Sequence, residues 1–429
     1  MRRQPALALA LILLAASAAS AQVTAFVGGR VIDGTGRVLE RGTVVVRDGV
    51  ITAAGPAADV RIPDGATRVD LAGKTLMPGL VNAHGHLSPV DGFRTGQQFY
   101  TRDNLLRQLR AYATYGVTTV FSLGDDGDEA FALRAEQSAG PPGRSRVFVA
   151  GPIVYTDTAD AARTATDAVI ARKPDLVKIR IDDNLGTTRK MPEAAWRATL
   201  ERATAAGLPL AVHIFYLADA KAAAQAGAHF IAHSVRDLPV DDAFLAAMRS
   251  TNACYSPTLM REVSTFVYES TPPWVHDPFF RRGYGPGIAA TVADTGRQAT
   301  FRASPGWAQG QKYKAGLEVA KANLKRVHEA GIRVAFGTDT GPAGRFQGFF
   351  EHLELELMVQ SGLTPMQALV AATGTAAACW NKQGQLGTIA PGAAADLLVL
   401  DANPLDDITN TRRLNAVYIG GRRVEPTTR

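Results

Sequence analysis

Eight short apolar segments alternate with stretches patterned like amphipathic helices, such as residues 104–116 and 192–207. The apolar segments span residues 80–87, 117–123, 147–154, 175–182, 208–215, 229–235, 253–259 and 334–340. Eight strand-then-helix units predict an α/β fold, a (β/α)8 barrel of the TIM type, with its active site at the C-terminal ends of the strands. An open, doubly wound sheet is the alternative, but it would be expected to offer a glycine-rich phosphate loop, and none follows these segments.

The two ends of the chain have a different pattern, with many β-branched residues between glycine-containing turns. GTVVVRDGVITAAG (42–55) and AADLLVLDA (394–402) are examples. Such stretches predict short strands, and their position on both sides of the central region predicts that the ends pair into one small β-sandwich domain. We therefore expect residues 22–77 and 383–429 to form the β-sandwich, and residues 78–382 to form the barrel.

Residues 1–21 have the pattern of a secretory signal peptide. Arg2 and Arg3 precede an apolar stretch at 6–16, and Ala19-Ser20-Ala21 is a small-x-small cleavage site. The stretch is short for a membrane-spanning helix, although a retained membrane anchor is the alternative. We expect a mature chain that begins near Gln22, works in the periplasm or is secreted, and has no stable membrane insertion.

Charge and cysteine content bear on the partners of the protein and on whether it contains a disulfide. The formal charge is +6, and loss of Arg2 and Arg3 with the leader lowers it to about +4. No basic run is interleaved with aromatic residues, so nucleic acid is not an expected partner. Cys254 and Cys379 are the two cysteines. An exported protein could pair them, but two unpaired, buried thiols that act as small hydrophobic side chains are the favoured interpretation.

Four of the eight histidines, and Asp339, lie toward the C-terminal ends of predicted strands. His84 and His86 are two residues apart, so both side chains point to the same face of the first strand. His213, His233 and Asp339 lie near the C-terminal ends of the fifth, sixth and eighth strands. A hydrogen-bonded structural histidine is the ordinary alternative for each alone. Together, four imidazoles and a carboxylate at one barrel mouth predict a site for a zinc-type ion.

Lys178 lies at the corresponding depth of the fourth strand, in DLVKIRID (175–182). A protonated lysine that faced inward beside metal ions would be strongly unfavourable. A neutral or carboxylated lysine fits better, because a carbamate would be an anionic bridging ligand. The alternative is a lysine whose ammonium group reaches the surface.

These residues resemble the metal site of the amidohydrolase superfamily: HGH in strand one, lysine in strand four, histidines in strands five and six, and the GTD aspartate in strand eight. MPGLVNAHGHL (77–87) and LGTIAPGAAADLLVLD (386–401) resemble the segments that link its barrel to its β-sandwich. The resemblance covers residues 25–425 and is strongest to imidazolonepropionase-like enzymes and metal-dependent Xaa-Pro dipeptidases, which are prolidase-like. Lys178 favours the binuclear members of that branch.

The resemblance implies two divalent metal ions, with zinc favoured. A carbamate on Lys178 and a hydroxide would bridge them, and Asp339 would take the proton of the hydroxide and deliver it to the leaving amine. The implied ligands are His84, His86 and Asp339 for the more buried ion, and His213 and His233 for the more exposed one.

Three features concern the substrate. Residues 260–314 form a long, aromatic-rich connection that we expect to cap the active site, favouring a hydrophobic or aromatic substrate group unless its aromatic residues only pack against each other. Arg180 could bind a substrate carboxylate, or it could pair with Asp182. Tyr216 could donate to the scissile oxygen or a substrate carboxylate, or it could be an ordinary surface tyrosine.

We therefore expect an exported, binuclear hydrolase of C–N bonds that acts on dipeptides or N-acyl amino acids. The same site could act on a lactone, a cyclic imide or a carbamate instead, because the fold does not fix the substrate. A metal-binding protein without turnover is a third and less favoured hypothesis. The expected partner is a small-molecule substrate, and assembly of several copies of the chain stays open.

Overall fold

The computed structural model describes residues 23–140 and 142–427, so the predicted signal peptide lies outside the described residues. Within them, two parallel sheets form the centre, with the strand orders β10-β9-β6 and β11-β12-β13-β14-β15. Parallel bridges from Val154 to Ile179 and from Gly85 to Thr340 join the sheet edges into a closed ring. The strands are β6 (Leu80–Gly85), β9 (Val117–Ser122), β10 (Arg146–Val149), β11 (Val177–Arg180), β12 (Leu210–His213), β13 (Phe230–Ala232), β14 (Cys254–Ser256) and β15 (Arg333–Val334).

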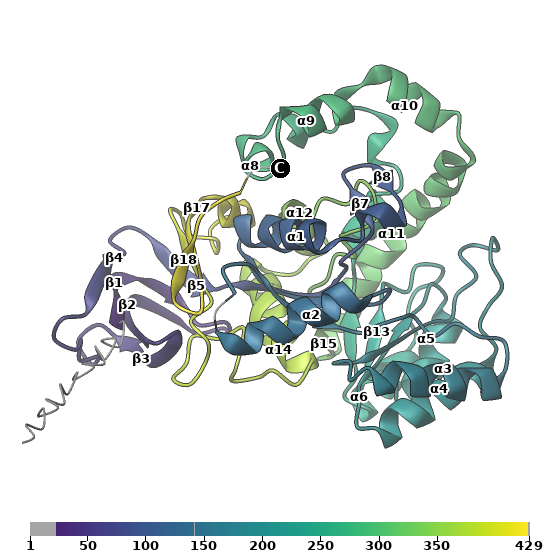
Figure 1. The fold of residues 1–429 in the computed structure, drawn as a ribbon, viewed down its shortest axis with the longest axis horizontal. Helices are drawn as coiled ribbons and strands as arrows, with labels where there is room; N and C mark the ends of the chain where they lie inside the picture. Colours follow the sequence, from purple (N-terminus) through teal and green to yellow (C-terminus); the bar gives the residue numbers. More distant parts are fainter. Residues whose placement is uncertain (1–22, 141, 428–429) are drawn as a thin grey trace, which may run out of the picture.

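The predicted barrel is thereby confirmed, with strands shorter than the apolar segments that predicted them. A helix follows every strand on the outside of the ring (Figure 1). Several of these helices begin at an N-cap side chain, such as Thr101, Thr158, Asp241 and Ser304. The helices are α1 (Arg102–Thr114), α2 (Asp128–Glu136), α3 (Ala159–Ala171), α4 (Glu193–Ala205), α5 (Leu217–Gln225), α6 (Asp242–Ser250), α11 (Pro305–Glu329) and α12 (Phe349–Gln360).

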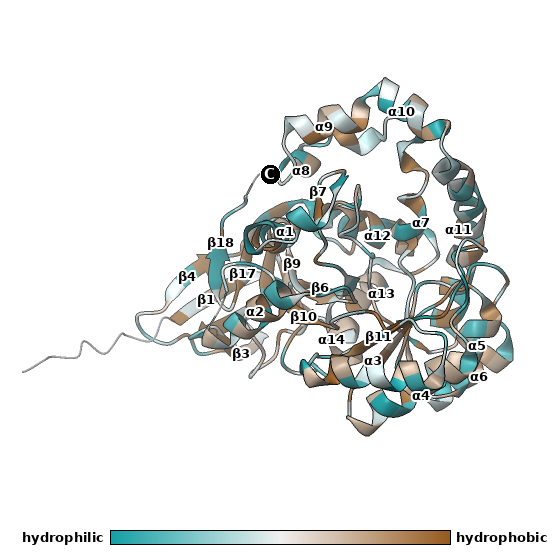
Figure 2. Cartoon of the chain, turned by 45° about the vertical axis from the view of Figure 1, so that its right-hand side comes forward, coloured by the Kyte–Doolittle hydropathy of each residue, from teal (hydrophilic) through white to brown (hydrophobic). Residues whose placement is uncertain are grey.

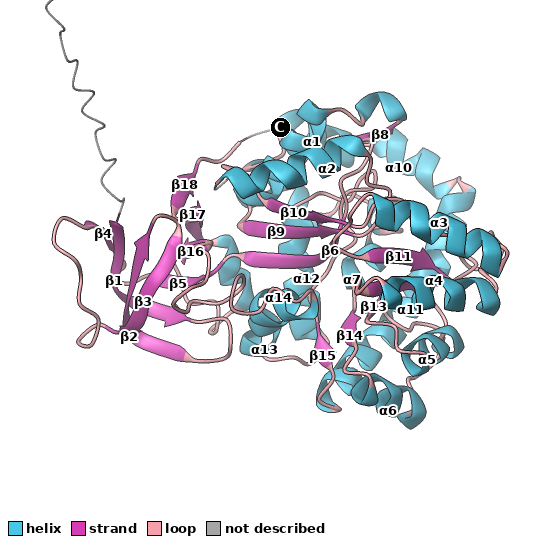
Figure 3. Cartoon of the chain, turned by 60° about the horizontal axis from the view of Figure 1, so that its bottom comes forward, coloured by secondary structure: helices cyan, strands magenta, loops and turns pink. Residues whose placement is uncertain are grey.

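Both ends of the chain contribute to one mixed sheet beside the barrel (Figure 3). Its order is β18-β17-β16-β5-β1-β2-β3, and β4 also pairs with β1. The junction is the antiparallel pair of β5 and β16, where Leu76 lies opposite Val399. The strands are β1 (Val23–Ile32), β2 (Val38–Arg47), β3 (Val50–Pro56), β4 (Thr67–Asp70), β5 (Thr75–Pro78), β16 (Leu397–Leu400), β17 (Leu414–Ile419) and β18 (Arg422–Val424).

The base of the barrel is closed by α13 (Pro365–Val370) and α14 (Ala376–Cys379). Trp380, which follows α14, stacks on Phe230 with ring centroids 4.5 Å apart and donates a hydrogen bond to the carbonyl oxygen of Ala83. Phe230 is the first residue of β13, so this contact lies at the opposite end of that strand from His233.

The favoured interpretation of two unpaired cysteines is wrong, because Cys254 and Cys379 form a disulfide. Both residues are buried, as expected. They lie at the first residue of β14 and the last residue of α14, and closure of the barrel base brings their Cα atoms to 6.1 Å. That distance is set by the tertiary packing of α14, which the sequence pattern does not report.

Residues 259–304 rise from the end of β14 as an arch of short helices above the barrel (Figure 2). The arch contains α7 (Leu259–Val263), α8 (Pro278–Arg281), α9 (Pro286–Ala293) and α10 (Thr295–Arg302). Its underside reaches the loops that follow β6 and β15, where the Tyr268 hydroxyl donates to the carbonyl oxygen of Gly344. The hairpin of β7 (Val90–Asp91) and β8 (Arg94–Thr95) rises to meet it. Within the described residues, no helix combines the length and the apolar character that a membrane crossing needs.

Candidate active site

His84 and His86 lie at the C-terminal end of β6 and point into the barrel mouth. The His84 side chain is fully buried, and the two imidazole centroids are 5.5 Å apart. Gly85 faces the opposite way, where a Cβ atom would come within 2.8 Å of the Tyr112 hydroxyl oxygen. Only glycine therefore lets α1 pack this closely against the strand that carries both histidines.

Asp339 meets these two histidines from the loop after β15. Its Oδ1 atom lies 2.8 Å from His86 Nε2 and 3.4 Å from His84 Nε2. One ligand atom from each of the three residues lies within 4.8 Å of the other two, an arrangement that could hold a metal ion. The backbone of Asp339 is left-handed, with φ of 58°, which turns the carboxylate back toward β6.

The other three predicted ligands lie against this group. Lys178 Nζ is 3.5 Å from His84 Nε2, and the lysine is buried. His233 Nε2 is 2.9 Å from His213 Nδ1, and the rings of His233 and His84 are 4.6 Å apart. The structure thus brings all six predicted ligands, from five different strands or strand ends, into one continuous cluster.

The electrostatics of the cluster favour the neutral form of three of its histidines. Burial lowers the pKa of His84 and His233 well below the usual range, and it lowers the pKa of His213 to about 4 against the opposing effect of Asp182. These imidazoles are therefore neutral, as metal ligation requires. Burial also lowers the pKa of Lys178 to about 7, with Asp339 and Asp182 opposing the shift. A large part of the Lys178 population is then a neutral amine near pH 7.

Asp339 stays ionised in the same environment. Burial by itself would raise the pKa of its carboxyl group, but the Arg345 guanidinium and hydrogen bonds with His84 and His86 outweigh burial and hold the pKa well below its usual range. Arg345 contacts Asp339 Oδ2, which leaves Oδ1 for the histidine side of the site. Sequence reasoning missed Arg345, because it follows the loop after β15 and belongs to no strand.

A buried polar network, also missed, holds the backbone around the ligands. Glu351 on α12 accepts hydrogen bonds through Oε1 from Asn82 Nδ2 at 2.7 Å and from Thr340 Oγ1 at 2.6 Å. Asn82 Oδ1 in turn accepts from the backbone N–H of His84 at 2.9 Å. One carboxylate on α12 thereby ties the strand that carries the HGH motif to the loop that carries Asp339. Asn82 shares the inward parity of His84 and His86, and that parity was a usable signal.

His233 is oriented in a similar way. Its Nδ1 atom is 2.7 Å from Thr258 Oγ1, which leaves Nε2 to face His213. Thr258 adopts φ of 46° and His233 adopts φ of 76°, both left-handed. A β-branched residue rarely occurs in that region, so the surrounding fold determines this conformation at the site.

The two predicted substrate contacts already have protein partners. Arg180 Nε donates to Asp182 Oδ1 at 2.8 Å, and Asp182 Oδ2 is 3.3 Å from His213 Nε2. Tyr216 donates its hydroxyl hydrogen to Asp183 Oδ1 at 2.8 Å. Arg180 therefore pairs with Asp182, which was the alternative expectation. Asp182 in turn lies against His213, so Arg180 helps to position that histidine indirectly.

The donor set fits divalent metal ions. His84 Nε2 and His86 Nε2 both face Asp339 Oδ1, and neutral imidazole nitrogens are good ligands for zinc-type ions. Lys178 forms no ion pair with a carboxylate in the described part of the chain, although burying an unpaired ammonium group is costly. A carboxylate beside imidazole nitrogens, with a buried lysine that has no described carboxylate partner, fits a site for divalent metal ions.

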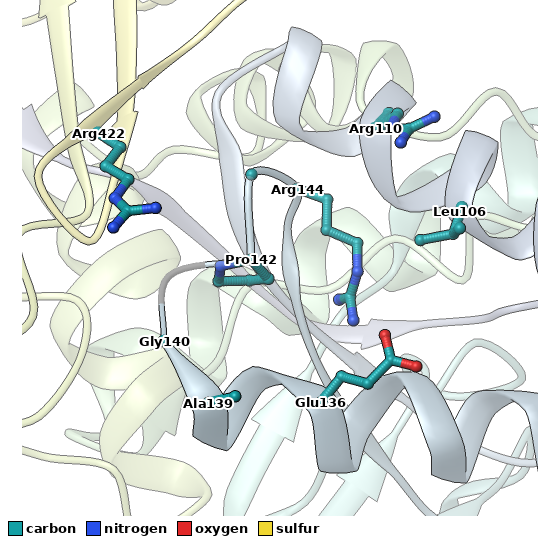
Figure 4. A pocket seen from close by; sticks show the side chains of 9 residues that line it. Leu106, Arg110, Glu136, Ala139, Gly140, Pro142, Arg144 and Arg422 are labelled. Atoms are coloured by element: carbon teal, nitrogen blue, oxygen red, sulfur yellow. The ribbon is translucent and has the colours of Figure 1, made fainter. Parts of the chain in front are cut away.

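Not every cavity belongs to this site. A cavity of about 380 Å³ lies between α1, the end of α2 and β18, and Figure 4 shows Arg110, Arg144, Glu136 and Arg422 around it. None of the six clustered ligands lines this cavity. This cavity is therefore separate from the candidate active site, which is the cluster of six ligands.

A closed (β/α)8 barrel with histidines, a lysine and an aspartate at its strand ends defines a metal-dependent hydrolase in architecture. Residues 75–424 match the amidohydrolase family, and the chain belongs to that family, whose members include hydrolases of C–N bonds. The predicted membership of the amidohydrolase superfamily is thereby confirmed.

The chain is similar to several characterised proteins along most of its length. It is 26% identical to the ochratoxinase of Aspergillus niger, with 96% of this chain and 88% of that protein covered. It is 26% identical to the imidazolonepropionase of Acidiphilium cryptum, with 86% and 90% covered. A solved structure of a putative prolidase from Bifidobacterium longum has a TM-score of 0.76 at 24% identity, covering 95% of this chain and 96% of that one.

Proposed function

We propose that this protein is an exported, binuclear metal-dependent amidohydrolase that cleaves the amide bond of dipeptides or N-acyl amino acids. The observation that carries the proposal is the cluster of His84, His86, Lys178, His213, His233 and Asp339, with Lys178 buried and unpaired with any described carboxylate. Similarity to proteins named ochratoxinase and to the structure of a Xaa-Pro dipeptidase, which has a TM-score of 0.75, supports this substrate class.

Two divalent ions, with zinc favoured, would be held by these residues. His84, His86 and Asp339 would bind the more buried ion, His213 and His233 the more exposed ion, and the Lys178 carbamate would bridge the two. When bound, the ions lower the pKa of a shared water so that hydroxide is available near neutral pH, and they polarise the scissile carbonyl group.

The chain itself supplies the proton transfer. Asp339 is ionised and exposes Oδ1 toward the histidines, so it can accept the proton of the attacking water. The same carboxyl group then delivers that proton to the amine that leaves. Arg345 positions the carboxylate by its contact with Oδ2 throughout.

A substrate panel tests the reaction class. Zinc-loaded enzyme is offered dipeptides, N-acyl amino acids, lactones, cyclic imides and aryl carbamates, and release of amine or acid is measured. We expect turnover of the dipeptides or of the N-acyl amino acids. Turnover of lactones alone, with every amide inert, would overturn the proposal in favour of the alternative substrate class. A protein that binds two ions and turns over no compound would support the non-catalytic hypothesis.

Replacement of Lys178 by Ala tests the bridging ligand. We expect the metal content to fall from two ions per chain to one or fewer, measured by elemental analysis after dialysis, and the activity to fall by about 10³-fold because the shared water is lost. Lys312→Ala, at an exposed lysine, is the matched control and should change neither quantity. Two tightly bound ions and full activity in Lys178→Ala would refute the carbamate.

Export rests on two independent features. The leader at residues 1–21 has the composition of a signal peptide, and the Cys254–Cys379 disulfide is of a kind that persists in oxidising compartments. We propose the periplasm or the extracellular medium as the place of action. Detection of the chain without its leader in an osmotic-shock or culture-medium fraction is the expected result, and a full-length chain in the cytosol would contradict it.

A further inference from the structure

A cavity of about 590 Å³ lies between the arch of residues 259–304 and the barrel, and the mechanism above does not use it. Its walls come from the tip of the β7–β8 hairpin, the segment after α7, the end of α9, α10 with the residues that follow it, and the loop after β15. Phe93, Tyr268, Val292 and Phe301 give the apolar part of the wall, and Ser264, Arg297 and Ser304 give the polar part. The volume is in the range that proteins use for small-molecule ligands, roughly 300–1,000 Å³.

The cavity is joined to the catalytic residues by one short loop. Ala343 lines the cavity, while Asp339 and Arg345 of the same loop contact each other at the metal site. The backbone N–H of Gly344 donates to the carbonyl oxygen of Gly92 at 3.1 Å, which fixes the hairpin tip against this loop. The loop that carries Asp339 and Arg345 therefore also borders the cavity.

The aromatic residues of the arch divide into two groups. Trp274 packs on the barrel helix α12, with its ring 5.3 Å from that of Phe349, and so helps to hold the arch on the barrel. Tyr268 and Phe301 instead border the cavity, and the ring of Tyr268 lies edge-on to Phe93 at 5.3 Å. This second group presents aromatic surface to open space, where a planar ligand group can stack.

Arg297 supplies a charge at the same place. Its guanidinium carbon lies 3.8 Å from the centre of the Phe93 ring, and it forms no ion pair with a described residue. The Asp294 carboxylate nearby is occupied as the N-cap of α10, where it accepts from the backbone N–H of Arg297. An arginine stacked on a cavity wall without a carboxylate partner is suited to an acidic group on a planar ligand.

From this arrangement we infer that the cavity is a substrate subsite for a planar aromatic group that bears an acidic substituent. The inference rests on the proposed function, because it places this group on the part of the amide substrate remote from the scissile bond. It names a specificity element in the arch, separate from the metal ligands.

Direct binding of 2-naphthoate, with 2-naphthamide as its uncharged analogue, tests the subsite by calorimetry on the purified enzyme. Thr300→Trp, which introduces an indole at a lining residue of α10, should weaken naphthoate binding at least tenfold, while Ala299→Trp at its exposed neighbour should not. Arg297→Gln should weaken naphthoate about tenfold and leave naphthamide unchanged. Arg281→Gln, at an exposed arginine of α8 outside the cavity, is the control for charge.

Three results would overturn the inference: no naphthoate binding, equal binding by all variants, or binding that is lost on metal chelation and indifferent to Thr300→Trp. Activity gives a second readout. The ratio of kcat/KM for N-(3-carboxybenzoyl) over N-acetyl amino acids should fall about tenfold in Thr300→Trp. If the wild-type enzyme cleaves no amide but naphthoate still binds as described, the proposed function fails and the binding site stands.

Discussion

Asp339→Asn is expected to lower kcat by about 10²- to 10⁴-fold, the range that a positioned acid–base group contributes. The amide keeps the size of the carboxylate but cannot accept the proton at Oδ1, which faces His84 and His86. It also leaves the buried Arg345 guanidinium without its anionic partner. Rates on a substrate that the wild-type enzyme hydrolyses, together with metal content and circular dichroism, measure the effect.

The matched control for this variant is Asp401→Asn, directly after β16, where the carboxylate pairs with Lys74 and with none of the six clustered ligands. It should keep full activity. If Asp339→Asn retains two ions and stays within tenfold of the wild-type rate, Asp339 is not the proton carrier, and the assignment of the catalytic base fails.

Removal of the disulfide is expected to have the largest effect on stability. Cys254 and Cys379 are 125 residues apart in the sequence, and loop-closure entropy for a link of this length gives about 4–5 kcal/mol of stabilisation. The double variant Cys254→Ala/Cys379→Ala should therefore lose about 4 kcal/mol of unfolding free energy. Denaturant titration of both proteins in non-reducing buffer measures the difference.

A reducing agent provides the internal control. It should destabilise the wild-type protein once unfolding exposes the buried disulfide, and it should leave the double variant unchanged. A double variant that unfolds within about 1 kcal/mol of the wild-type protein would show that packing of α14 alone holds the barrel base.

The parts of this structure that were predictable from the sequence depend on local periodicity. The apolar runs at 80–87 and 208–215 predict buried strands. The two-residue spacing of His84 and His86 predicts that both side chains lie on the same face of their strand. The remaining ligands could be placed because the C-terminal ends of barrel strands converge on one face of the barrel, independently of the conformation of the loops.

The parts that were not predictable depend on contacts between distant segments. Arg345 reaches Asp339 only because the loop after β15 turns back on itself, and Glu351 reaches Asn82 across 269 positions of sequence. The pairing of Cys254 with Cys379 likewise depends on where α14 docks. Neither the two-residue period of strands nor the 3.6-residue period of helices indicates which distant residues will come into contact.

The pairing of β5 with β16 has a consequence for the order in which the protein is assembled. β5 ends at Pro78, and after Gly79 the chain continues directly into β6 with His84, so the strand that leads into the metal site is hydrogen-bonded to residues Leu397–Leu400. These residues follow all the barrel strands in the sequence and are therefore made long after β5 and β6. An early segment must therefore wait for a late one, and contacts of such long range slow folding. The ligand cluster is therefore expected to reach its final geometry only after β16 has been made and has paired with β5.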